Sequence, residues 1–85
     1  MHFGVVVTHV YPALWLERAR LAAAAGDLDE ALAWTERVVR PRHYDASRGV
    51  VIHRALGLRA DVLDRLGRGG EAAAVRREAA ALKAP

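Results

Sequence analysis

The chain has 85 residues and a net charge of +3, 53% of its residues are hydrophobic, and it contains no cysteine. This length allows one small domain, and the missing cysteines exclude disulfides and thiolate metal sites. The small positive charge, carried almost entirely by arginine, does not indicate a nucleic-acid partner. There is no signal-peptide pattern and no apolar run near the roughly 20 residues that span a bilayer. We therefore expect a cytoplasmic protein without a membrane partner.

Alanine dominates the apolar composition, with 18 copies, whereas large apolar side chains are few. An alanine buries little area compared with leucine or phenylalanine. The composition therefore predicts a thin core of closely packed helices, completed by a protein partner or by a second copy in a homo-oligomer. Heavy use of Ala, Arg, Gly and Val with a single Lys is typical of a GC-rich genome.

Residues 1–11, "MHFGVVVTHVY", are rich in β-branched side chains and by propensity favour a strand. The only other strand candidate is "GVVIH" at 49–53, and a lone strand cannot satisfy its backbone polar groups. Three possibilities stay open for this N-terminal arm. It pairs across a dimer, lies extended on the helices, or joins the helical fold.

Residues 12–39 predict a first helical hairpin. Pro12 fits the first position of a helix, and Gly26 is typical of the residue just after a helix end. In between, apolar residues at 14, 15, 21, 22 and 25 follow a helical spacing. Asp27 or Asp29 can cap the second helix, whose predicted inward positions are Leu28, Ala31, Leu32, Thr35 and Val38 or Val39.

A loop is predicted at 40–46 from its Pro, Asp and Ser content, followed by a second hairpin at 47–83. The third helix runs to about residue 66, "GRGG" forms the turn, and the fourth helix follows it. Gly57 lies inside the third helix at a cost of about 1 kcal/mol, so we expect close packing to require a small residue there. The sequence thus predicts an all-α fold of two antiparallel hairpins, four helices in total, forming one domain over 12–85.

An internal repeat connects the two hairpins. When residues 15–37 are aligned with residues 56–78, six positions are identical, at an offset of 41 residues. The identities fall where geometry constrains a hairpin: a small residue in mid-helix, the turn glycine, and an alanine where the helices cross. The pairs are Arg18 and Arg59, Ala19 and Ala60, Gly26 and Gly67, Glu30 and Glu71, Ala31 and Ala72, and Ala33 and Ala74.

This pattern resembles the tetratricopeptide repeat family, whose unit is a helix–turn–helix of an α-solenoid. The matching positions are Trp15, Ala19, Gly26 and Ala31 with Leu28, then Leu56, Ala60, Gly67 and Ala72. Three features depart from the family pattern. The offset of 41 exceeds the usual 34 or so, Arg18 and Arg59 replace the usual leucine, and Gly69 replaces a large residue.

The resemblance implies a non-enzymatic adaptor that binds a peptide or partner helix on the concave face of its first helices. About three stacked units are usually needed to bury a continuous core, so we expect a homodimer, a capped fragment of a longer protein, or a subunit that docks on a partner. In the family register, the partner-binding groove would consist of Leu16, Arg20, Ala23, Arg54, Asp61, Asp64 and Arg65.

A basic stretch provides an alternative site, for nucleic acid or an acidic partner: Arg37, Arg40, Arg42, His43 and Arg48, continuing to Arg54. We favour a solvated loop over this interpretation because Asp45 interrupts the run and a single aromatic residue lies within it.

No catalytic, cofactor or metal site is predicted. Ser47 fits a helix cap, Thr35 an inward position, and Asp61 and Asp64 a pair of solvated or Arg-paired acids. The four histidines lack the i, i+4 spacing of a helical zinc site. "GRGG" lacks the Lys-Ser/Thr of a phosphate-binding loop, so we interpret it as a turn.

Overall fold

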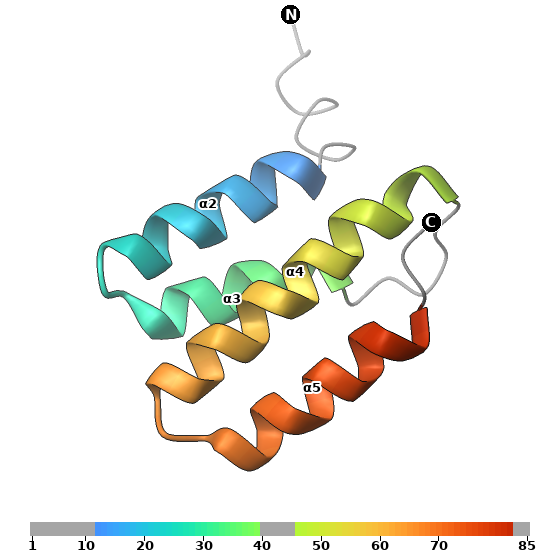
Figure 1. The fold of residues 1–85 in the computed structure, drawn as a ribbon. Helices are drawn as coiled ribbons and strands as arrows, with labels where there is room; N and C mark the ends of the chain where they lie inside the picture. The colour runs from blue at the N-terminus through green and yellow to red at the C-terminus, as the bar shows by residue number, and fades with distance from the viewer. Residues whose placement is uncertain (1–11, 40–45, 83–85) are drawn as a thin grey trace, which may run out of the picture.

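The computed structural model describes the backbone of residues 12–39 and 46–82, and the side chains of 13–39 and 49–82. These residues form helices α2 (Pro12–Ala24), α3 (Leu28–Val39), α4 (Ala46–Arg65) and α5 (Gly69–Leu82). The described ranges contain no strand. Helices α2 and α3 form one antiparallel hairpin and α4 and α5 the other, so the predicted all-α fold of two hairpins is confirmed (Figure 1).

The hairpins lie against each other in chain order. Helix α4 packs on α3 and, less extensively, on α2 (Figure 1). The third helix begins at Ala46, one residue earlier than predicted, and the fourth at Gly69. The predicted N-terminal arm at 1–11 and loop residues 40–45 lie outside the described residues.

The same turn closes both hairpins. Gly26 and Gly67 have positive φ values of 85° and 79°, a conformation that a residue with a Cβ adopts only under strain. In the first turn Asp27 N–H donates to Ala22 O at 2.9 Å and Gly26 N–H to Ala23 O at 3.1 Å. The second turn repeats both bonds with Arg68 and Gly67 as donors. This pair of bonds is the Schellman motif, so the predicted role of both glycines is confirmed.

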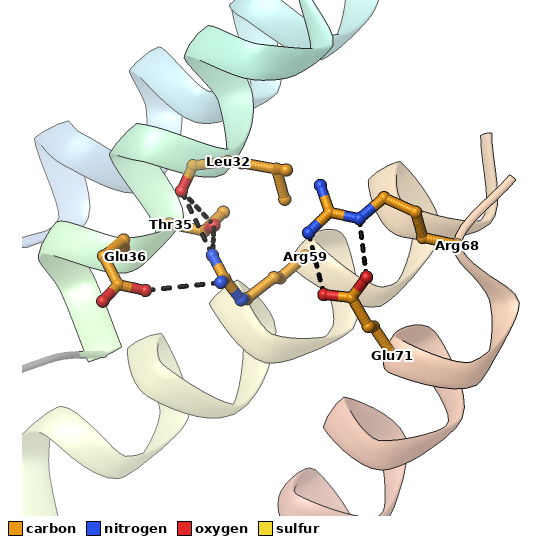
Figure 2. A network of polar contacts seen from close by, with 6 residues as sticks. All are labelled: Leu32, Thr35, Glu36, Arg59, Arg68 and Glu71. Atoms are coloured by element: carbon orange, nitrogen blue, oxygen red, sulfur yellow. Dashed lines mark hydrogen bonds and ion pairs between the residues drawn. The ribbon is translucent and has the colours of Figure 1, made fainter. Parts of the chain in front are cut away.

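The start of the second helix differs between the hairpins. Asp27 Oδ1 accepts a hydrogen bond from Glu30 N–H at 3.3 Å and caps α3. The equivalent residue before α5 is Arg68, which cannot cap through its side chain. Arg68 instead binds Glu71 through two hydrogen bonds of 2.7 and 2.8 Å (Figure 2). These bonds hold the pKa of Glu71 below its ordinary value.

Alanine is the most frequent residue in the apolar core. Among the described residues, eight of the fourteen buried apolar side chains are alanines. The repeat alanines Ala19, Ala31, Ala60 and Ala72 are all fully buried, which confirms the predicted close approach of the paired helices. Larger core side chains lie mainly on α4, where Ile52, Leu56, Val62 and Leu63 are buried.

Helix α2 buries a different face from the one that its apolar spacing suggested. Leu14 and Leu21, two of the positions in that pattern, are 51% and 61% exposed, and Ala25 is also exposed. Within that pattern, Ala22 is buried and Trp15 is half-buried, and the other buried positions of the helix are Leu16, Ala19 and Ala23. The helix has apolar residues on nearly all sides, so its periodicity could not identify the face that contacts α3 and α4.

A polar bridge joins the two hairpins. Thr35 of α3 is fully buried, and its Oγ1 donates to Leu32 O at 2.8 Å and accepts from Arg59 Nη1 of α4 at 3.2 Å (Figure 2). The same Arg59 donates to Leu32 O at 3.3 Å and forms an ion pair with Glu36 at 3.4 Å. A buried hydroxyl without partners would be costly, so Arg59 satisfies Thr35 while linking α4 to α3.

Thr35→Val should destabilise the fold by about 1–2 kcal/mol, because the valine keeps the shape of threonine but removes both hydrogen bonds. Combined with Arg59→Met in a double-mutant cycle, it should show a coupling of about 0.5–2 kcal/mol, measured by urea unfolding. Arg77→Met on the exposed side of α5 is the control and should show no coupling with Thr35→Val. Additive losses for Thr35 and Arg59 would contradict the bridge.

Candidate functional site

A groove lies between α2 and α4, on the face where the first helices of the two hairpins meet. Its volume is about 280 Å³, and it is lined by Leu16, Arg20, Arg54, Gly57, Leu58 and Asp61. Helix α2 contributes the first two residues and α4 the other four. Each hairpin places its first helix on the same side of the molecule, which is why these distant segments meet.

Four of the predicted groove residues are brought together here: Leu16, Arg20, Arg54 and Asp61. The other three have different roles. Ala23 belongs to the core cluster that contains Val62. Arg65 donates through Nη1 to Ala23 O at 3.1 Å, which ties the end of α4 to the last turn of α2. Asp64 faces α5, where it pairs with Arg76 at 2.8 Å.

The two acids of α4 share one partner. Arg76 Nη2 of α5 lies 3.1 Å from Asp61 Oδ1 and 2.8 Å from Asp64 Oδ2. These contacts, with that to Asp64 the strongest, raise the pKa of Arg76 above its ordinary value. Of the two predicted alternatives, solvated or Arg-paired acids, the structure shows the pairing with arginine. Because Arg76 carries one positive charge for two carboxylates and lies closer to Asp64, Asp61 keeps part of its negative charge at the groove.

The prediction that close packing requires a small residue at Gly57 is wrong. It is exposed, and a Cβ placed on it would meet no atom within 4 Å. No packing constraint therefore requires glycine at this position in the free protein. The residue instead leaves the backbone of α4 bare on the groove wall. The family register places Gly57 on the face of the groove, as the equivalent of Leu16, and both residues line the groove in the structure.

Leu58 was missed as a groove residue. It was not among the predicted positions because the face of α4 that the family register assigns to the groove does not include Leu58. In the structure, Leu58 is half-buried at the edge of two core clusters and still lines the groove. Together with Leu16 it makes the apolar part of the groove wall.

The two residues of the basic stretch whose side chains are described, Arg37 and Arg54, lie in different surroundings. Arg37 stacks over the rings of Trp15 and Trp34, at 5.6 and 5.3 Å from their centroids. Arg54 lines the groove instead. Arg40, Arg42, His43 and the side chain of Arg48 lie outside the described residues. The described part of the stretch therefore forms no continuous basic surface.

Two further features of the described residues bear on function. No group of three or more His, Cys, Asp or Glu side chains among them is placed to hold a metal ion. Within the same residues, no helix combines the length and the apolar character that crossing a membrane requires.

Comparison of the chain with protein-family models, with curated proteins and with solved structures found no match. The resemblance to tetratricopeptide repeats therefore rests on the residues of the repeat, and the site is interpreted from its own geometry.

Gly57→Ala should stabilise the protein by about 0.5–1 kcal/mol, because the added methyl group meets open space and a helix interior disfavours glycine. The gain should appear as a higher Tm in thermal unfolding followed by circular dichroism at one protein concentration. Gly26→Ala is the matched contrast. It also meets open space, but its positive φ should make the substitution destabilising by about 1 kcal/mol. A loss of stability in Gly57→Ala would contradict the open groove wall.

Proposed function

We propose that this chain is a non-enzymatic protein-interaction module built from two tetratricopeptide-like hairpins. It binds a peptide or partner helix in the groove between α2 and α4, and it self-associates. The observation that supports this function best is the groove itself. Both hairpins contribute to it, and Gly57 keeps its wall open at a helix position where an alanine would be more stable.

The groove residues define the chemistry of the partner segment. Leu58 offers an apolar contact, with a small contribution from Leu16, which is 7% exposed. Arg20 and Arg54 make no ion pair within the described part of the chain. The acidic side chain at this surface, Asp61, shares Arg76 with Asp64, and Arg20 and Arg54 together still leave the groove with a positive charge. The groove therefore suits a segment with an apolar anchor and a nearby carboxylate, which the free arginines would bind.

The candidate catalytic groups have structural tasks, which supports a non-enzymatic interpretation. Thr35 is fully buried and bonded to Leu32 and Arg59. Asp61 and Asp64 are held by Arg76. None of these groups stands beside a base that would activate it.

Groove binding can be tested with a phage-displayed library of random peptides selected on the purified chain. We expect selected peptides to carry an apolar residue beside Asp or Glu, and to bind the isolated protein in fluorescence anisotropy. Gly57→Leu should lower their affinity by about tenfold or more, because its side chain occupies the groove while the backbone stays helical. Ala74→Leu, on the exposed side of α5, is the matched control and should leave affinity unchanged.

Other outcomes would point elsewhere. Peptides that bind Gly57→Leu as well as the unmodified chain would place the binding surface outside the groove. Binding of a single-stranded oligonucleotide that falls steeply with salt, and is lost on Arg40→Ala with Arg42→Ala, would support the basic stretch instead.

A further inference from the structure

A stripe of four exposed residues runs along α2. Leu14 and Leu21 are 51% and 61% exposed, and Glu17 and Arg18 between them are exposed as well. Their spacing places all four on one face of the helix, opposite the buried Leu16, Ala19 and Ala23. We call this set the α2 stripe. Its two leucines are the largest apolar side chains that the first hairpin leaves open to solvent.

The repeat shows what covers this face elsewhere in the same fold. At an offset of 41 residues, the equivalents of the α2 stripe are Ala55, Leu58, Arg59 and Val62 of α4. Ala55 and Val62 are fully buried, and Arg59 is bonded to residues of α3. In the second hairpin this face therefore has a helix packed on it, whereas none of the described helices packs on the α2 stripe.

The α2 stripe is complementary to itself. Leu14 and Leu21 lie equally far from the midpoint between Glu17 and Arg18. Two copies of α2 that pair antiparallel about that midpoint bring Leu14 of one copy onto Leu21 of the other. They also bring Glu17 of each copy beside Arg18 of the other. This is the reciprocal contact that a twofold symmetric interface requires.

The two charged groups are suited to this pairing. Glu17 makes no ion pair within the described part of the chain. The guanidinium of Arg18 lies 5.6 Å from the centroid of the Trp34 ring, and this contact restricts the position of an exposed positive charge within the α2 stripe. A charge that is already positioned loses less conformational entropy when it meets its partner.

We propose that a second copy of this chain docks on the α2 stripe, with the two α2 helices antiparallel and the Glu17–Arg18 contacts formed twice. The inference deepens the self-association in the proposed function and is independent of groove binding. Leu16 and Arg20 lie on other sides of α2 than the stripe, so the dimer leaves both grooves open. A partner with two binding segments would then gain affinity from the pair.

The charges on α2 and α5 disfavour a head-to-tail stack of two copies. A head-to-tail stack would place the α2 stripe on α5 of the next copy, as α4 is placed on α3. Arg18 takes the position of Arg59, whose ion-pair partner is Glu36 at 3.4 Å. The residue of α5 equivalent to Glu36 is Arg77. The head-to-tail stack would therefore set two arginines against each other, while the antiparallel pair joins opposite charges.

The first test is the mass of the full chain by sedimentation equilibrium over a range of concentrations. Helix α2 has 13 residues and is about 20 Å long, so the contact is smaller than a standard interface of roughly 1,200–2,000 Å². We therefore expect a monomer–dimer equilibrium with a Kd of about 10–100 µM. Leu21→Glu should raise the Kd by about tenfold or more, because the substitution acts twice in each dimer.

The second test uses charge exchange to establish the register. Glu17→Arg and Arg18→Glu should each be monomeric, because each puts like charges together at both symmetric contacts. Mixed in equal amounts, the two variants should form a heterodimer in which both contacts are again opposite charges. The Glu17→Arg/Arg18→Glu double variant should dimerise by itself for the same reason. Circular dichroism verifies that each variant remains helical.

Arg77→Glu is the control, with the same charge change as Arg18→Glu but on α5, and it should leave the dimer intact. Four results would overturn the proposal: a monomer at all concentrations, assemblies that grow beyond two chains, a dimer that tolerates Leu21→Glu, or single-charge variants whose mixture stays monomeric. Peptide binding lost with Gly57→Leu but kept in these variants would show that the groove functions without the dimer.

Discussion

The structure depends on how closely its helices approach one another. With alanines at the crossing points of both hairpins, the backbones come near enough for a core of small side chains to make dense contacts. That approach requires turns as tight as those at Gly26 and Gly67, whose positive φ values let the chain reverse at once. A larger residue at Ala19 or Ala60 would separate the helices and remove these contacts.

A core of alanines leaves little area to hold one hairpin against the other, and here a polar contact contributes. Arg59 bridges α4 to α3 through Thr35, Leu32 O and Glu36 (Figure 2). The repeat carries the same arginine in α2, as Arg18, but there it stacks on Trp34 and lies next to the open face. The arginine at this repeat position therefore joins α4 to α3 when it is Arg59, and lies at the surface when it is Arg18.

The groove and the α2 stripe lie on different sides of the same helix, which gives the small domain two independent surfaces. The groove has an open wall at Gly57 and two arginines without an ion pair among the described residues, so it suits an acidic segment with an apolar anchor. The α2 stripe combines leucines with one acid and one base in a symmetric order, so it suits a copy of itself. Association through the α2 stripe would multiply binding through the groove without altering it.

Local chemistry in the sequence determined the turns, the two hairpins and the alanine crossing points, because each depends on neighbours within a few residues. It left the cap of α3 open between Asp27 and Asp29, and the structure shows Asp27 in that role. Most of the groove followed from the repeat register, as Leu16, Arg20, Arg54 and Asp61 show. Only the tertiary structure decided that Leu14 and Leu21 face outward, that Gly57 is unpacked and that Arg65 binds Ala23 O. The reason is physical: α2 is apolar on nearly all sides, and the space around Gly57 depends on side chains of another hairpin.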